Sequence, residues 1–257
     1  MACLACIISS ATAYAGAWPT PAGKGQIIST TLTDSASIGF DDNGDANQEV
    51  RFSKTEGAIY WEHGLSQKTT LVLQTSFQDI QFRAGVDEVN FSGVGESYLG
   101  VRRVMWRGNK TVVSAQGGLL FAGSGEAISD ADLGFGSTHF EARLLIGRSI
   151  KLANRDGFLD VQMARRMRPG ATPDEWRLDA TAGWRPAAKV QVLAQGFYTA
   201  SGEQFEVARR NTRLKLQSSL VYAWSPKTSY QIGLYRTVAG RNIIKEKAFF
   251  IAVWSRY

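Results

Sequence analysis

The sequence predicts an all-β protein, a 12-stranded antiparallel transmembrane β-barrel that occupies residues 25–257 as one domain. Three observations predict this fold. Apolar and polar residues alternate with a period of two in twelve segments, most of them about ten residues long. The connections between these segments alternate between short and long, and the last residue is aromatic.

Composition narrows the class of protein before any pattern is considered. The chain has 257 residues, of which 44% are hydrophobic and 11% aromatic, and this apolar content excludes a disordered protein. No stretch reaches the roughly 18 consecutive apolar residues of a membrane-spanning helix. The 29 Lys and Arg residues exceed the 23 Asp and Glu residues, but the charges are interspersed, so we expect no nucleic-acid partner.

Residues 1–15 have the features of a signal peptide. They are small, apolar and uncharged, and they end in Ala13-Tyr14-Ala15, which fits the A-x-A cleavage rule and predicts a mature start at Gly16. The usual basic start is missing, which indicates a signal peptide truncated at its start by the choice of initiator methionine. An ordinary flexible N-terminus is the alternative. A lipoprotein signal at Cys6 is disfavoured because Cys3 stands where leucine is required. Residues 16–24 are then a periplasmic segment before the barrel.

The alternation is clearest in residues 213–224. Leu214, Leu216 and Leu220 fall on one face, whereas Arg213 and Lys215 fall on the other. Successive side chains of a strand point to opposite faces, whereas a helix would distribute these leucines around its axis. The twelve segments with this pattern are 26–33, 51–62, 69–82, 95–106, 111–122, 140–147, 159–164, 176–184, 189–199, 213–224, 230–235 and 247–257.

The connections alternate between short and long, as they do in an outer-membrane barrel. The short connections, rich in Gly, Asn, Asp and Pro, are 63–68, 107–110, 153–156, 186–188 and 225–227. The long connections are 34–50, 83–94, 123–138, 169–175, 200–211 and 239–246. Short periplasmic turns and long extracellular loops on an even number of strands place both termini in the periplasm.

A soluble sandwich or lipocalin-like barrel also alternates in this way, with its apolar face inward. Three features favour the membrane barrel instead. The segments are longer than the five to six residues that are average for soluble strands. Aromatic residues such as Trp61, Trp106 and Trp224 gather at segment ends, where interfacial girdles lie. The polar face carries charges of both signs, which suits a wet or ion-paired lumen.

The final segment supports this assignment by resemblance. Phe249, Ile251, Val253 and Tyr257 share one face, and the segment resembles the C-terminal signal strand that the barrel-assembly machinery reads in outer-membrane proteins. The stretches 16–26 and 60–69 resemble outer-membrane transporters of the MetA-pathway phenol-degradation type. This resemblance implies a Gram-negative outer-membrane location, contact with lipid and lipopolysaccharide, and a small-molecule solute.

The sequence gives little support to an enzyme or a cofactor. With only His63 and His139, and no cysteine after residue 6, we expect no metal site and no cofactor. Outer-membrane phospholipase A, also a 12-stranded barrel, uses a His and a Ser two residues apart. Ser137 and His139 have this spacing in reversed order and lack an orienting Asn or Asp, so an enzyme is the least favoured function.

One acidic loop is a second candidate site. Glu126, Asp130 and Asp132 could bind calcium through their carboxylates, but their spacing does not match the twelve-residue calcium loop. A solvated loop is the favoured interpretation.

If the apolar face meets lipid, charged side chains point into the lumen. They are Glu56, Glu62, Arg102, Glu141, Arg143, Asp160, Arg166, Arg177, Asp179, Arg213 and Lys215. We expect neighbouring charges to pair across the wall, and we expect Arg143, Arg177, Arg213 and Lys215 to form a positive track opposite Glu56 and Glu62. The predicted function is a channel for passive or facilitated passage of small solutes. The alternatives are a closed structural or adhesin-like barrel and, least favoured, a lipid-modifying enzyme.

Overall fold

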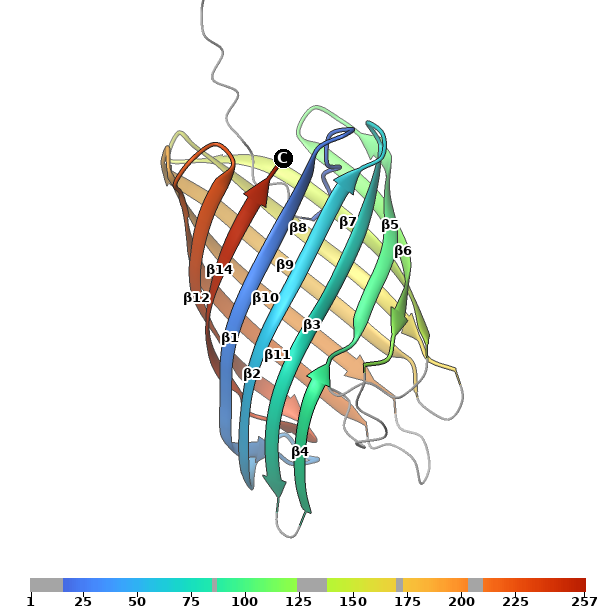
Figure 1. Cartoon of the computed structure of the whole chain (residues 1–257), viewed down its shortest axis with the longest axis vertical. Coiled ribbons are helices and arrows are strands. Elements are labelled where there is room, and N and C mark those ends of the chain that lie inside the picture. The colour runs from blue at the N-terminus through green and yellow to red at the C-terminus, as the bar shows by residue number, and fades with distance from the viewer. Residues whose placement is uncertain (1–15, 85–86, 124–137, 170–172, 203–209) are drawn as a thin grey trace, which may run out of the picture.

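The computed structural model describes residues 16–84, 87–123, 138–169, 173–202 and 210–257, and these form a closed antiparallel β-barrel (Figure 1). The strands are β1 (Gly25–Phe40), β2 (Ala46–Gly64), β3 (Thr69–Ala84), β4 (Asp87–Val94), β5 (Ser97–Arg107), β6 (Thr111–Phe121), β7 (His139–Leu152), β8 (Arg155–Met167), β9 (Glu175–Ala187), β10 (Val190–Ser201), β11 (Asn211–Ala223), β12 (Thr228–Arg241), β13 (Ile243–Ile244) and β14 (Lys247–Arg256).

Twelve strand positions circle the barrel within these residues. β4 and β5 pair with successive parts of β3 and together occupy one position, and β13 is a short addition beside the end of β1. Neighbours in sequence are neighbours in the sheet, and β1 closes the barrel by pairing with both β2 and β14. The predicted 12-stranded fold is confirmed. No helix of the described residues is long and apolar enough to cross a membrane.

The outer face of the barrel is apolar, and the inner face is polar. Leu216 and Leu220 are 50% and 43% exposed on the outside, whereas Ser219 and Val221 between and beside them are buried inside. The same period of two holds in other strands, where exposed large hydrophobic residues alternate with buried polar ones. A water-soluble barrel would have the reverse arrangement, because its apolar side chains would fill the core.

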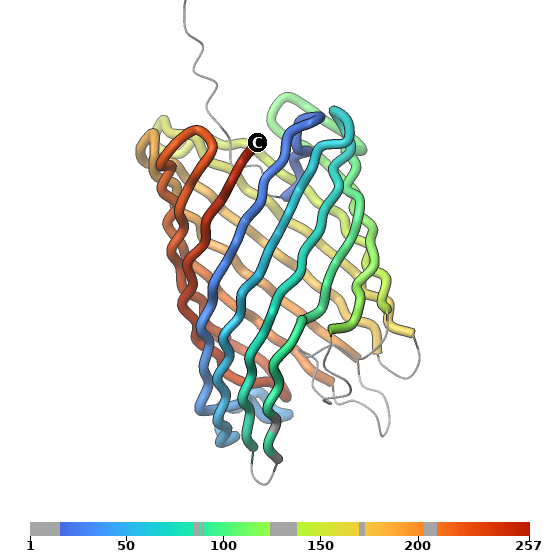
Figure 2. Tube along the Cα trace, in the orientation of Figure 1, coloured from blue at the N-terminus to red at the C-terminus, as the bar shows by residue number. Residues whose placement is uncertain are grey.

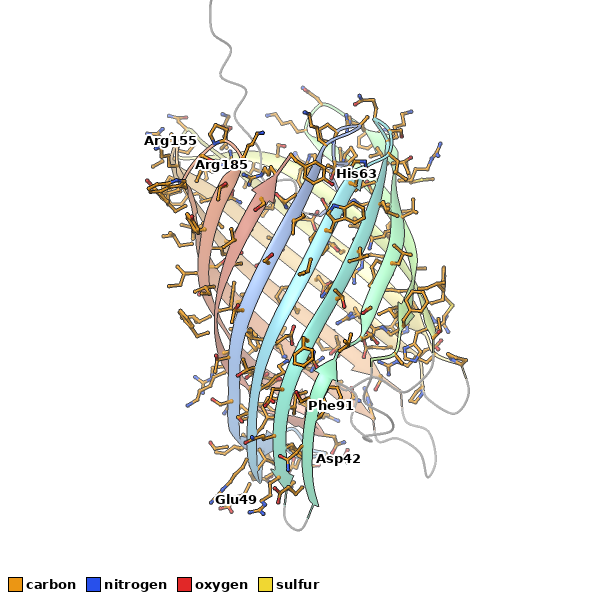
Figure 3. All side chains as sticks on the ribbon, viewed as in Figure 1. Asp42, Glu49, His63, Phe91, Arg155 and Arg185 are labelled. Atoms are coloured by element: carbon orange, nitrogen blue, oxygen red, sulfur yellow. The ribbon has the colours of Figure 1, made fainter. Side chains whose placement is uncertain are left out.

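The two ends of the barrel differ. Short turns, the described N-terminal residues and Tyr257 lie at one end, which we call the turn end; the opposite end is the loop end (Figure 2). In Figure 3, His63, Arg155 and Arg185 mark the turn end, and Asp42 and Glu49 mark the loop end. The strands are tilted relative to the barrel axis, as closure of a sheet requires.

At the loop end, several strands are longer than the alternation predicts. Segments 34–50 and 83–94 were expected to be long loops, but β1 and β2 continue to Phe40 and from Ala46, and β4 pairs with β3 from Asp87. Here the prediction of loop lengths was wrong. Strand ends beyond the apolar band have no lipid to face, so backbone pairing can continue without any alternation of hydrophobicity.

The β1–β2 hairpin ends in a turn organised by Asp41. The carboxylate Oδ1 accepts hydrogen bonds from the backbone N–H groups of Asn43 and Asp45, both at 2.9 Å, and Oδ2 accepts one from the Asn47 amide at 2.7 Å. These hydrogen bonds, that of Asp45 foremost, lower the pKa of the Asp41 carboxyl below its usual range. A short, internally bonded turn therefore replaces the expected loop.

Candidate functional site: the barrel lumen

A cavity of about 730 Å³ lies inside the barrel. The charged residues around it that the alternation assigns to the lumen are Glu56, Arg102, Glu141, Arg143, Asp160, Arg166, Arg177, Asp179, Arg213 and Lys215. The eleventh, Glu62, does not border the cavity but bonds to Arg102, which does. The period-two pattern of each strand thus brings side chains from β2 to β11 to one interior surface.

Near the turn end, Arg102 and Glu62 form a buried ion pair. The Arg102 Nη2 atom lies 2.6 Å from Glu62 Oε1, and the two side chains are 2% and 0% exposed. Glu62 also accepts hydrogen bonds from the Tyr60 hydroxyl and from Thr20 Oγ1. Two charges removed from water need this degree of partnering, because a lone buried charge is strongly destabilising. Glu62 is therefore a structural anchor and not a free acidic site opposite a positive track.

In the middle of the lumen, Arg143 connects three strands. Its guanidinium pairs with Asp179 on β9 at 2.5 Å and with Glu141 on its own strand at 3.0 Å, and it donates to the Gln162 amide oxygen on β8 at 2.8 Å. The predicted pairing of Glu141 with Arg143 is present. The network cross-links the wall and leaves the charge of Arg143 shared between two carboxylates.

Towards the loop end, acids and arginines form a second network. Arg166 pairs with Glu96 at 3.0 Å, and Arg177 lies 3.3 Å from Glu175 and 3.7 Å from Glu141. Arg177 pairs with these glutamates and not with Asp179, which is bonded to Arg143. The Arg177 side chain is 29% exposed, more than the other ion-paired lumen arginines, so its charge remains open to the cavity.

On the opposite wall, a third group surrounds Glu246, which is 1% exposed. Lys215 Nζ lies 2.6 Å from Glu246 Oε2, and the Tyr235 hydroxyl donates to the nearby Asp34 carboxylate. Glu56 pairs with Lys54 at 3.2 Å. Of the bases expected to form a positive track, Arg143 and Lys215 are thus neutralised by close carboxylates. Of that set, Arg177 and Arg213 also line the cavity, and Arg177 lies 3.3 Å from Glu175.

Residues Gly16–Pro21, which we call the N-terminal segment, lie inside the turn end of the barrel. The Ala17 N–H donates to Asp160 Oδ2 at 2.8 Å, and its carbonyl accepts from Ser114 Oγ at 2.5 Å. The Thr20 N–H donates to Thr70 Oγ1 at 2.9 Å. The sequence predicts a periplasmic segment before the barrel and carries no pattern that indicates folding into the lumen.

Apolar contacts fix the same segment against the wall. Ala17 is completely buried in a cluster with Val104, Val112 and Leu145. The Trp18 ring packs edge-on against Phe158, with 5.8 Å between ring centroids. Gly147 on β7 makes room for this tryptophan, because a Cβ there would collide with the ring.

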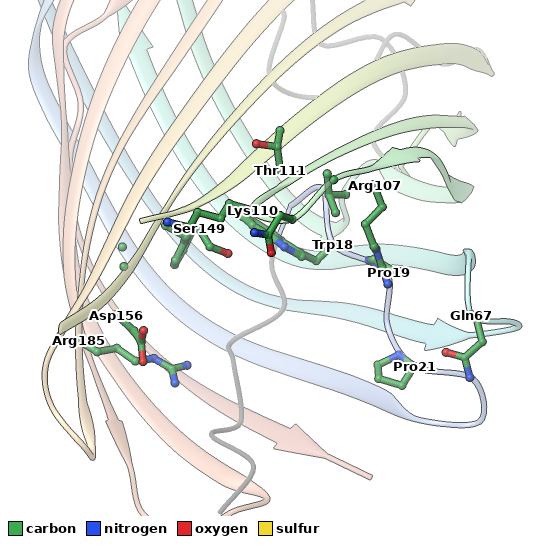
Figure 4. A pocket seen from close by; sticks show the side chains of 16 residues that line it. Trp18, Pro19, Pro21, Gln67, Arg107, Lys110, Thr111, Ser149, Asp156 and Arg185 are labelled. Atoms are coloured by element: carbon green, nitrogen blue, oxygen red, sulfur yellow. The ribbon is translucent and has the colours of Figure 1, made fainter. Parts of the chain in front are cut away.

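The N-terminal segment separates two cavities. The lumen cavity includes Gly16 and Phe158, whereas Trp18, Pro19 and Pro21 border a second cavity of about 440 Å³ at the turn end. Figure 4 shows this outer cavity, with Lys110, Ser149 and Arg185 among its other lining residues. The N-terminal segment therefore borders both cavities, between the lumen and the turn end.

Several lumen residues escape sequence analysis. Glu96 falls in the break between β4 and β5, and Glu246 and Asp34 fall in segments expected to be loops. Asp34 and Glu246 each adjoin a predicted strand, and Glu96 lies inside the predicted segment 95–106 but was not assigned to the lumen. Uncharged residues also line the cavity and were not sought, namely Gln74, Tyr98, Gln116, Gln162, Gln195, Gln217 and Tyr235.

The other candidate sites have ordinary surroundings or lie outside the described residues. His63 stacks between Trp61 and Tyr257 at the turn end, and His139 lies 3.9 Å from Glu96 at the loop end. Within the part of the chain that the structure describes, no three His, Cys, Asp or Glu side chains are arranged to hold a metal ion. Four of the candidate site residues lie outside the described residues, namely Glu126, Asp130, Asp132 and Ser137.

The final strand is held on both edges. β14 pairs with β1 from Ser35↔Lys247 to Gln26↔Arg256 and with β12 along its length. Phe249, Ile251, Val253 and Tyr257, the residues of the predicted assembly signal, point outward and are 39–52% exposed.

No family model and no curated protein matches the sequence. Solved structures do match. An outer membrane channel from Pseudomonas putida F1 has a TM-score of 0.73 and 13% identity, with 96% of this chain and 100% of that chain covered. The NanC porin has a TM-score of 0.55 and 10% identity, covering 88% and 98%. The translocator domain of the autotransporter NalP from Neisseria meningitidis has a TM-score of 0.54 and 10% identity, covering 93% and 90%.

At these identities the likeness is one of fold. Channels, porins and autotransporter domains share it, so the fold alone does not choose among them. The closed barrel agrees in fold with each of these structures. The chain therefore has the fold of the bacterial outer-membrane β-barrels.

Proposed function

We propose that this protein is an outer-membrane channel that lets small solutes cross passively or by facilitated passage. The observation that carries the proposal is the lumen cavity of about 730 Å³, lined by charged and amide side chains in a barrel with an apolar exterior. A barrel that served only as an anchor would have no need of a cavity lined by polar side chains. The P. putida channel and the NanC porin, which share the fold, add support.

The location follows from the same features. The turn end, with both described chain ends, faces the periplasm, and the projecting β1–β4 strands face outward from the cell. The exposed apolar band contacts outer-membrane lipid, and the loop end contacts lipopolysaccharide. A signal peptide of residues 1–15 directs export, and the barrel-assembly machinery inserts the chain. The protein is not an enzyme in this proposal and needs no cofactor.

Reconstitution of the purified barrel in planar bilayers tests the proposal. We expect discrete conductance steps and swelling of proteoliposomes in small solutes. A heat-modifiable, correctly folded barrel that neither conducts nor admits any solute would favour the closed structural barrel, which the buried N-terminal segment makes the second candidate. Hydrolysis of lipid that is lost in His139→Ala would favour the enzyme.

We expect the lumen to prefer anionic solutes modestly. Arg177 and Arg213 line the cavity, and positive charges in a low-dielectric wall raise the local concentration of anions. Replacing both with Gln should shift the reversal potential of the open channel toward cations, and the shift should shrink in high salt, which screens the charges. Measurement of ion selectivity under a salt gradient checks this.

The matched control removes two arginines from the outside. Arg103 is exposed, and Arg165 pairs with Asp174 at the loop end, so Arg103→Gln with Arg165→Gln changes net charge equally and leaves the lumen intact. Equal ion selectivity in the lumen variant and in this control would mean that Arg177 and Arg213 stabilise the barrel wall and do not select the solute.

A further inference from the structure

Asp160 on β8 is a buried lumen carboxylate whose hydrogen-bond partners are neutral. Its side chain accepts hydrogen bonds from the Ala17 N–H at 2.8 Å and from the Gln162 amide at 2.6 Å. It is 2% exposed, and in the described part of the chain it forms no ion pair with Lys, Arg or His. A carboxylate removed this far from water needs an opposite charge or further donors.

Arg102 and Arg143 act on Asp160 only through space, and neither forms an ion pair with it among the described residues. Arg102 is bonded to Glu62 at 2.6 Å, and Arg143 is bonded to Asp179 at 2.5 Å and to Glu141 at 3.0 Å. Each guanidinium is held in a geometry that points it at another acid. Asp160 is therefore left without a cation in direct contact among the described residues.

Gly16 lies directly against this carboxylate. A Cβ added at Gly16 would collide with both Asp160 oxygens and with the carboxyl carbon, so the Gly16 α-carbon is in contact with the acid. The α-nitrogen is one bond away from that carbon. Gly16 is also the residue at which Ala13-Tyr14-Ala15 predicts the processed chain to begin.

We propose that cleavage before Gly16 creates an α-ammonium group that pairs with Asp160 inside the lumen and fastens the N-terminal segment there. Cleavage converts a neutral amide nitrogen into a cation with three N–H donors, which is the group that Asp160 lacks. The pair would form only in the processed chain. Cleavage of the bond between Ala15 and Gly16 during export would therefore also fasten the segment that closes the turn end. This inference rests on the cleavage site and is independent of which solute crosses.

The chain offers a clean chemical probe for this pair. Cys3 and Cys6 both precede the cleavage site, so the processed protein has no thiol and one introduced cysteine is unique. Ala17 is fully buried and Pro19 is buried, so Ala17→Cys, or Pro19→Cys as a second position, reports release of the segment through its rate of labelling by a charged maleimide. Intact mass of protein from outer membranes should first show a start at Gly16.

Two changes remove the pair in different ways. Asp160→Asn removes the acid, and insertion of Ser-Gln between Ala15 and Gly16 moves the ammonium away while every barrel residue is kept. Each should label the cysteine about tenfold faster or more than the parent, the scale expected when a buried charge pair is broken. Asp156→Asn is the control, because Asp156 is an exposed acid of the same strand paired with Lys151.

The labelling rates either support or overturn the proposed ion pair. Fast labelling in both variants at both cysteine positions, with the Asp156→Asn control at the parental rate and heat-modifiable migration retained, supports the pair. A mature start other than Gly16, or parental labelling rates in the insertion variant, overturns it. Since labelling does not require conduction, failure of this proposal and failure of the channel proposal are distinguishable.

Discussion

A barrel that lacks Gly16–Pro21, made by joining Ala15 directly to Ala22, should conduct several-fold more than the parent in planar bilayers. This segment separates the lumen cavity from the cavity at the turn end, and its removal merges the two spaces. The strands do not depend on it, because β1 begins at Gly25 and keeps its pairing with β2 and β14. Single-channel current in symmetric salt is the measurement.

A graded variant and a control sharpen this result. Trp18→Ala removes the ring that packs on Phe158 and fills the space over Gly147, so we expect an intermediate increase in current. Lys24→Ala changes an exposed residue just beyond the segment and should leave conductance at the parental value. If the deletion conducts no more than the parent, the segment is not the barrier, and the narrowest point lies among the ion pairs around Arg143.

The second large effect concerns the last strand. Deleting Phe249–Tyr257 should abolish the protein in the outer membrane, because β14 is hydrogen-bonded to β1 and to β12 and its loss opens two edges of the sheet. In lipid, each unpaired backbone group costs several kcal/mol, so an open barrel cannot be stable. Immunoblots of outer-membrane fractions check this. Normal amounts of heat-modifiable barrel from the truncated gene would contradict it.

Tyr257→Ala should be a milder version of the same defect. The Tyr257 hydroxyl accepts from Trp61 Nε1 at 2.8 Å and lies 3.1 Å from His63 Nδ1, which ties β14 to β2 across the seam. Loss of two hydrogen bonds is worth about 1–3 kcal/mol, and the temperature of heat modification should fall accordingly. Tyr230→Ala, at a tyrosine that is similarly exposed on β12, is the control and should have the smaller effect.

The lumen charges were predictable because strand geometry leaves little freedom. Once Leu216 and Leu220 are assigned to lipid, Lys215 must face inward, and the same logic fixes Arg143 and Asp179 on their strands. What this logic cannot give is partner choice. Either Arg143 or Arg177 could pair with Asp179, and the choice of Arg143 depends on the tilt and register of three strands. The alternation within each strand predicts neither tilt nor register.

The N-terminal segment was beyond prediction for a different reason. Residues 16–21 have no period, and two prolines exclude regular hydrogen bonding, so the sequence describes them only as an extended stretch. Their position is set by complementary features far away, such as the missing side chain at Gly147 and the carboxylate of Asp160. Such complementarity becomes visible only after the barrel has brought β7 and β8 to the segment.

The seam of the barrel has a consequence for folding kinetics. Gly25 and Tyr257 exchange both backbone hydrogen bonds, each at 3.1 Å, and Gly25 leaves room for the tyrosine ring. The backbone groups on one edge of β1 pair with β2, and those on the other edge can pair only with β14. The barrel therefore keeps two open edges until the strands most distant in sequence have paired. Non-local pairing of this kind is slow. The rate at which the barrel closes should therefore depend on the pairing of β1 with β14 more than on the stability of any single hairpin.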